Sequence, residues 1–364
     1  LWGWTIAISG LFLTILAPVM GYFGDHKKNL SSNFLFFSTF IVVILSSCLW
    51  FSQPSANYVF YTLMLVLASN TVYEMGQVFY NSELLKFKKQ IPLGEFSGKA
   101  WASGYLGGIA CLSIILFLVI IPDNNFLNLS KENFEHVRIC GPVVGLWFLF
   151  FSIPFLISIK KINNSKITVK HSNFFESIKV ALKDKNKINF LIARMIYTDG
   201  LITLFSFGGI YASGTFNFNF NEIIIFGILI NISAAIGAYF LGFLEDRIGM
   251  KKVILISLFS LIIICFIILL IDEKILFWIL GVSSGFFIGS IQSSSRTALI
   301  KISKQSELKK MFGLYAVSGK ATNFLGPFLV ASITTIFNSQ RVGMSAILIF
   351  LILGALLLTR TKIE

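Results

Sequence analysis

The chain has 364 residues, of which 55% are hydrophobic and only 13% are charged, and its mean hydropathy is +0.81. A soluble domain carries about twice that charged fraction. The composition therefore excludes an ordinary soluble protein and indicates an all-α polytopic membrane protein. The net charge of +13 would point to nucleic-acid binding only if the basic residues formed one patch.

Long apolar stretches recur along the whole chain. About 20 apolar residues cross the ~30 Å hydrocarbon core of a bilayer. The pattern predicts eleven membrane spans, at residues 2–23, 34–51, 58–80, 97–121, 142–159, 188–211, 223–244, 253–271, 275–295, 311–337 and 342–358. The stretch 275–295 is among the least apolar of them.

The 30 Lys and Arg residues alternate between loops. Most lie in the loops after the odd-numbered spans and in the C-terminal tail, whereas the intervening loops carry four: Lys131, Arg138, Lys274 and Arg341. This alternation follows the positive-inside rule, which places basic loops in the cytoplasm. The basic charge therefore sets the membrane topology, and we expect no nucleic-acid partner.

The first span runs from outside to inside by this rule. No charged segment precedes it, and the chain starts with Leu1, so it does not have the pattern of a signal peptide. We therefore expect at least one further helix upstream in the natural protein.

Parts of the sequence match at a constant offset of 221 residues. The offset is shared by the string SGKA at 97–100 and 318–321, by Gly21 and Gly242, and by Asp25 and Asp246. Matching landmarks lie six spans apart, which predicts two parallel repeats related by an axis along the membrane normal. We expect the two SGKA strings to occupy equivalent places in the two half-bundles.

The loop at 242–252, GFLEDRIGMKK, resembles the signature of the major facilitator superfamily. The loop near Asp25 departs from it, with His26 where Arg is usual and the second glycine absent. Further segments are similar to the branch that includes the yeast vacuolar amino-acid effluxers of autophagy and their bacterial relatives: FYNSEL (79–84), SGKAWASGYLGG (97–108), YTDG (197–200), IQSSSR (291–296) and FGLYAVSGKATNFLGP (312–327). The resemblance implies two six-helix bundles, of which residues 1–364 lack the first helix.

The resemblance also implies the domain organisation. Residues 1–159 correspond to transmembrane helices 2–6, residues 188–364 correspond to helices 7–12, and a basic cytoplasmic linker at 160–187 joins them. The linker carries eight lysines, and apolar residues recur in it every four positions from Phe174. This pattern predicts a short amphipathic helix on the lipid surface. A disordered linker is the alternative.

Charged residues within predicted spans are expensive and therefore informative. Asp199 lies near the middle of its span, and Glu74 lies in the cytoplasmic half of the third. We expect these acids to bind an amino or other cationic group, or to carry a proton. The alternative is a structural ion pair with one of the buried cations, Arg194 or Lys320.

In the resembled superfamily the first, fourth, seventh and tenth helices line the central cavity. The resemblance places Glu74, Asp199 and Gln292 on the fourth, seventh and tenth. Helical spacings of three and four put further polar residues on the face of Glu74, namely Asn70, Tyr73 and Gln77. For Gln292 a helix–helix hydrogen bond is the alternative. Because one cavity-lining helix is absent, we expect residues 1–364 alone not to transport.

Two short loops are candidate gates. One carries Gly21 and Asp25, and the other carries Gly242, Asp246 and Arg247. The aspartates are expected to bond to neighbouring helix N-termini or basic side chains and to latch the inward face closed. The alternative is that only the basic residues matter, for topology.

Lys99 and Lys320 each follow a glycine, but the glycine spacing is not that of a phosphate loop. We therefore expect no nucleotide cofactor. Each lysine either pairs with a carboxylate at the inner gate or extends its charge to the membrane surface. We read Gly326-Pro327 as a kink in its helix.

Catalytic and metal-binding patterns are not evident. The three histidines lie in predicted loops, the four cysteines are scattered singly, and no HExxH string occurs. We therefore expect no metal site and no enzyme.

The sequence indicates a secondary transporter, a permease or effluxer that works by alternating access. Resemblance suggests amino acids as cargo, with protons carried by Asp199 or Glu74. Abundant Lys, Asn, Ile and Phe favour a bacterial plasma membrane, whose lipids would surround the chain. A passive channel, a structural membrane protein and a membrane enzyme are the alternatives.

Overall fold

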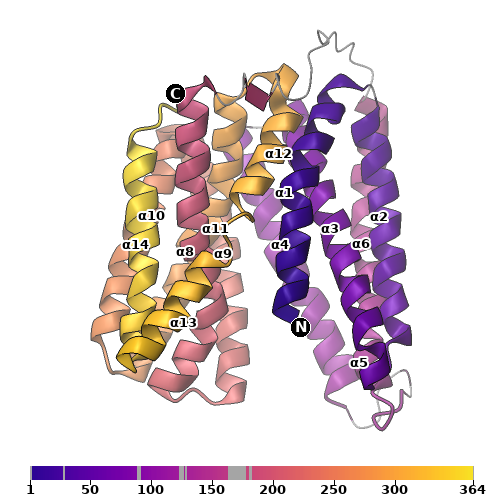
Figure 1. Cartoon of the computed structure of the whole chain (residues 1–364), viewed down its shortest axis with the longest axis vertical. Coiled ribbons are helices and arrows are strands. Elements are labelled where there is room, and N and C mark those ends of the chain that lie inside the picture. The colour runs from indigo at the N-terminus through magenta and orange to yellow at the C-terminus, as the bar shows by residue number, and fades with distance from the viewer. Residues whose placement is uncertain are drawn as a thin grey trace. The chain divides into compact units, whose positions relative to one another are not determined.

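The computed structural model describes residues 2–27, 29–87, 92–122, 127, 129–162, 178–179 and 183–363. All the regular structure in these residues is helical (Figure 1). The all-α class predicted from composition is therefore confirmed. The amphipathic helix predicted within the linker lies almost wholly outside the described residues.

Nine of the described helices are long and apolar enough to cross a membrane. Two of the eleven predicted spans do not meet that standard. The helix that covers 58–80 is long, but polar residues such as Asn70 and Glu74 lower its hydropathy. The predicted span 311–337 is not one helix.

The break in this last span corrects the sequence prediction. One helix, α12 (Leu308–Ser318), ends before a turn at 319–324, and a second, α13 (Leu325–Phe337), begins after it (Figure 1). Pro327 is the third residue of α13, within the first turn, where a missing N–H costs nothing. The proline therefore starts a new helix after the turn, where the sequence suggested a kink.

The chain divides into two compact units, and neither corresponds to one half of the sequence. Unit 1 is formed by residues 1–82, 108–172 and 306–317, and unit 2 by 83–107, 173–305 and 318–364. The first part of α4 thus belongs to unit 2, and nearly all of α12 belongs to unit 1. The division at 160–187 stays a prediction about the sequence repeats.

Unit 1 contains the N-terminal helices. They are α1 (Trp2–His26), α2 (Leu30–Cys48), η1 (Leu49–Phe51), η2 (Ala56–Tyr58), α3 (Val59–Glu83, all but its last residue), the end of α4 (Leu93–Ile115), η4 (Leu116–Ile120), α5 (Glu135–Arg138), α6 (Cys140–Ile162) and α12 up to residue 317. Its buried cluster joins α2, α3 and α6 through Leu35, Phe79 and Ile159.

Unit 2 contains most of the C-terminal helices. They are η3 (Leu84–Phe87), the start of α4, α8 (Lys185–Phe216), α9 (Phe220–Ile248), α10 (Met250–Leu270), α11 (Lys274–Ile302), α13 and α14 (Gln340–Thr359). Helix α9 packs along α11, and α14 packs along α8.

Glycines set the closeness of α9 to α11. A Cβ atom on Gly237 would overlap the carbonyl oxygen of Phe286, and one on Gly289 would overlap that of Ala234. Small residues let membrane helices approach this closely, so that van der Waals contact replaces the hydrophobic effect as the attraction. These two helices therefore form a rigid base for unit 2.

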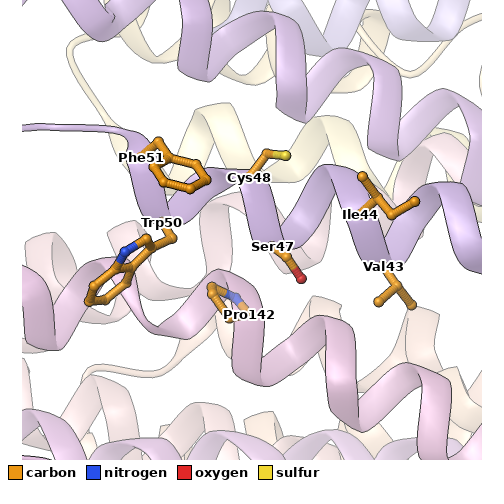
Figure 2. A pocket seen from close by; sticks show the side chains of 7 residues that line it. All are labelled: Val43, Ile44, Ser47, Cys48, Trp50, Phe51 and Pro142. Carbon is orange, nitrogen blue, oxygen red and sulfur yellow. The ribbon is translucent and has the colours of Figure 1, made fainter.

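An open apolar hollow of about 380 Å³ lies in unit 1 between the end of α2, η1 and α6. Figure 2 shows its lining, which includes Trp50, Phe51 and Pro142 and no charged side chain. None of the site residues predicted from the sequence lines it. It therefore does not match the polar site that the sequence indicates.

Candidate functional site

Two aspartates each cap the N-terminus of a helix distant in sequence. In unit 2, the backbone N–H groups of Gly94 and Glu95 donate to the Asp246 carboxylate over 2.9 and 2.7 Å. In unit 1, those of Lys309 and Lys310 donate to Asp25 over 3.1 and 2.9 Å. Each carboxylate satisfies the second and third N–H groups of its helix, which have no partner within the helix, and complements the helix dipole.

The two capped helices approach their partners at glycines in the same way. A Cβ on Gly98 would overlap the carbonyl oxygen of Ala238, and one on Gly313 would lie 2.5 Å from that of Ala17. Ala17 and Ala238 are 221 residues apart, but Gly98 and Gly313 are 215 apart. The two units thus repeat one arrangement, with a different offset in the capped helices.

This difference overturns the interpretation of the SGKA strings. In the register set by the caps, SGKA at 97–100 matches FGLY at 312–315, not SGKA at 318–321. The identical letters are therefore six residues out of structural register. They share one local contact, because the serine of each string bonds to an arginine.

The arginine bonded to the first string belongs to a buried polar cluster that the sequence did not predict. Arg296, 4% exposed, donates from Nε and Nη2 to Ser97 Oγ over 3.1 and 2.9 Å and from Nη2 to the Ser97 carbonyl over 3.1 Å. Glu245, 1% exposed, accepts from the hydroxyls of Ser294 and Thr297, both at 2.5 Å. Arg296 also acts electrostatically on Glu245.

The cluster was missed because predicted spans ended just before it. The predicted limits of 244 and 295 placed Glu245 and Arg296 in cytoplasmic loops, whereas α9 and α11 continue to Ile248 and Ile302. A signal was present in the serine run of IQSSSR, which continues the helix beyond its apolar window.

Asp199 lies on α8 and is 2% exposed. Its carbonyl oxygen accepts from Thr203 Oγ1 over 2.6 Å, and Thr322 from the turn before α13 lies beside its carboxyl group. Within the described part of the chain, Asp199 Oδ1 has no hydrogen-bond partner. A buried carboxylate with an unsatisfied oxygen is costly for the fold, which favours a binding role.

Arg194 lies five residues earlier on α8 and does not pair with Asp199. Its Nη1 donates to Ser318 Oγ over 2.7 Å, and its guanidinium covers the position where Gly319 would carry a Cβ. Arg194 thus holds the end of α12 against α8. Lys320 lies half-buried in the turn that follows.

The polar stripe predicted around Glu74 is divided among different neighbours. Asn70 Nδ2 donates to Ser9 Oγ on α1 over 2.8 Å, whereas the exposed Tyr73 packs its ring 5.8 Å from that of Phe148 on α6. Glu74 and Gln77 are half-buried. Tyr73 therefore does not share a common lining with Asn70.

The remaining predicted residues have the following contacts. Tyr105 donates to Gln292 Oε1 over 2.5 Å, which is the helix–helix bond given as the alternative. Lys99 pairs with Glu95 at 2.5 Å, and the exposed Arg247 lies over the Phe243 ring at 4.6 Å. Gly21 and Gly242 lie against the capped helices near Lys309 and Gly94.

Metal ligands were also considered. Among the residues that the structure describes, no three His, Cys, Asp or Glu side chains are grouped so as to hold a metal ion. The chemistry of the candidate site therefore rests on carboxylates, hydroxyls and amides.

We expect Asp246→Ala to lower the free energy of unfolding by about 1–2 kcal/mol, because the N-terminus of α4 loses two hydrogen bonds to a charged cap. Asp25→Ala should act similarly at α12. The matched control is Asp272→Ala, whose carboxylate side chain is 88% exposed. Thermal unfolding in detergent measures the difference, and equal shifts for Asp246 and Asp272 would contradict the assignment of the caps.

A family model described as "Vacuole effluxer Atg22 like" matches residues 89–364. Among curated proteins, the uncharacterized MFS-type transporter YxiO of Bacillus subtilis is 22% identical over 368 residues, covering 98% of this chain and 83% of that protein. Autophagy-related protein 22 of Kluyveromyces lactis is 23% identical over 392 residues, covering 96% and 77%.

Solved structures show the same fold at low sequence identity. The E. coli fucose:proton symporter FucP matches with a TM-score of 0.71 and 13% identity, covering 97% of this chain and 89% of that one. A bacterial homologue of the iron transporter ferroportin, in an outward-facing state, matches with a TM-score of 0.68 and 11% identity, covering 98% and 89%. These matches confirm the major-facilitator fold.

Proposed function

Because this chain belongs to the family of Atg22-like vacuole effluxers within the major facilitator superfamily, we propose that it carries amino acids across its membrane by alternating access. It is an integral membrane protein of a family of transporters, and its relatives imply a small-molecule cargo. The amino-acid cargo, the alternating mechanism and the coupling to protons are the proposal.

The observation that carries the proposal is the buried carboxylate of Asp199. An acid in a membrane-spanning helix is normally paired or functional, and its Oδ1 has no partner among the described residues. Arg194 lies on the same helix about 7.5 Å further along the axis. Opposite charges at that separation suit a zwitterion, which needs an acceptor for its ammonium and a donor for its carboxylate.

The capped helices support the alternating mechanism. Asp25 and Asp246 each bond a helix from the other half of the sequence. If the two halves of the sequence move against each other, these caps have to open and close in each cycle. Helix caps worth about 1 kcal/mol are strong enough to favour one state and weak enough to release.

The membrane in which the chain works is also part of the proposal. A relative of nearly the same extent comes from Bacillus subtilis, whereas the fungal relatives are described as vacuole effluxers. We assign this chain to a bacterial plasma membrane, with surrounding lipid as its other partner.

We expect Asp199→Asn to lower amino-acid exchange about 100-fold, because removal of one partner from a buried charged interaction costs about 3 kcal/mol. Counterflow in proteoliposomes made with the natural protein that contains this chain measures the loss. Glu74→Gln tests the second acid in the same assay.

Asp272→Asn is the matched control, because it removes a carboxylate whose side chain is 88% exposed. It should leave exchange unchanged. Full exchange by Asp199→Asn, with the folded protein recovered at the parent level, would exclude Asp199 from the transport site. Flux that rises linearly with concentration in the parent would instead indicate a channel.

A further inference from the structure

Three buried oxygen atoms meet the turn between α12 and α13 without a hydrogen-bond partner in the described part of the chain. They are Asp199 Oδ1, Thr322 Oγ1 and Asn323 Oδ1. Thr322 lies beside the Asp199 carboxyl, and Asn323 is the next residue of the same turn. Each such atom is costly when it is removed from water and left unpaired, so three in one turn require an explanation.

The packing here leaves room for a small ligand only. A Cβ on Gly326 would overlap Thr203 Oγ1 and lie 3.0 Å from the Asp199 carbonyl oxygen. Helix α13 therefore starts directly against α8 at the level of Asp199. Neither cavity of about 380 or about 50 Å³ is lined by Asp199, Thr322 or Asn323. A single ion fits these surroundings better than an organic cargo.

The donor set selects the kind of ion. It consists of a carboxylate, a hydroxyl and an amide oxygen, which are hard ligands without nitrogen or sulfur. The end of α12 adds backbone carbonyls that its broken helix no longer pairs, the arrangement by which discontinuous membrane helices hold alkali ions. One carboxylate balances a single positive charge, and Arg194, held on Ser318, adds no negative charge.

We propose that Asp199, Thr322 and Asn323 bind a small monovalent metal cation of the sodium type at the break between α12 and α13. A proton on Asp199 would let the acid donate one hydrogen bond, which leaves the amide oxygen of Asn323 unpaired. A metal ion satisfies all three oxygens together. That this ion couples to transport rests on the proposed function, whereas its binding does not.

Equilibrium binding of radioactive sodium to the purified natural protein in detergent tests the site. The parent should bind sodium saturably, with displacement by unlabelled sodium and none by choline. Asp199→Asn should abolish binding, and Thr322→Val and Asn323→Leu should each weaken it about tenfold or more. Both of these last changes keep the side-chain shape and the net charge, so they test the site even if Asp199→Asn fails to fold.

Thr335→Val is the matched control, because Thr335 is an exposed threonine on α13 whose hydroxyl bonds only within its own helix. It should bind sodium like the parent. No displaceable sodium in the parent, or equal binding in all three site variants, would overturn the cation site.

A parallel counterflow assay separates this inference from the proposed function. Amino-acid exchange that persists in choline buffer, with no sodium binding, overturns the cation site and leaves the transporter intact. Sodium binding lost in the site variants, with no amino-acid exchange, supports the cation site and contradicts the proposed cargo.

Discussion

Arg296→Met should lower the free energy of unfolding by about 3–5 kcal/mol, because it leaves the carboxylate of Glu245 buried without its positive neighbour. Glu245 is 1% exposed, and two hydroxyls alone then remain to stabilise its charge. The substitution also removes three hydrogen bonds from Arg296 to Ser97, through which α11 holds the start of α4. Thermal unfolding in detergent and the yield of monodisperse protein measure the effect.

Arg247→Met is the matched control, because Arg247 lies on the adjacent turn of α9 and is exposed. It should change stability by less than about 1 kcal/mol. The double variant Glu245→Gln with Arg296→Met should recover much of the loss, because no buried charge then stays uncompensated. Equal losses for Arg247→Met and Arg296→Met would contradict the buried cluster.

Gly237→Leu should prevent unit 2 from packing, at a cost of at least about 3 kcal/mol. Even the first added atom would overlap the Phe286 carbonyl oxygen, which belongs to the backbone and cannot rotate away. Helices α9 and α11 would have to separate, and the neighbouring contacts of Gly285 and Gly289 would be lost with them.

Gly227→Leu provides the control on the same helix, because a Cβ on Gly227 meets nothing within 4 Å. It should give folded protein in parent-like yield, slightly stabilised by the loss of a glycine from a helix. Size-exclusion profiles in detergent compare the two variants. A well-folded Gly237→Leu protein would show that the close approach of α9 to α11 is not required.

Much of the fold could be predicted because membrane helices are long apolar windows and basic loops mark one side. The helical class and the superfamily followed from these patterns and from GFLEDRIGMKK. The break at 319–324 could not be predicted, because residues 311–337 form one window long enough to cross the membrane. What divides this window is the contact of Gly319 and Gly326 with α8, which is tertiary.

The candidate site was predictable only in part. Asp199 stands out as a charge within an apolar stretch, and Asp25 and Asp246 stand out by their constant offset. The N–H groups that they cap carry no side-chain signal. Thr322 and Asn323 are ordinary polar residues in the sequence, and only their buried, unpartnered oxygens distinguish them.

The buried pair Glu245 and Arg296 shows a further reason. A hydropathy window ends where charge begins, so it treats the first charged residue after a span as solvated. In unit 2 the helices extend past that point, and Ser97, 199 residues from Arg296 in sequence, covers its guanidinium. Contacts of that separation are not visible in local sequence patterns.

The most direct test of the central claim is amino-acid counterflow in proteoliposomes that contain the natural protein, with each amino acid supplied in turn inside and outside. The account predicts saturable exchange of at least one amino acid, accelerated by substrate on the opposite side and lost in Asp199→Asn. No exchange of any amino acid at several pH values, by protein that is folded and inserted, would contradict it.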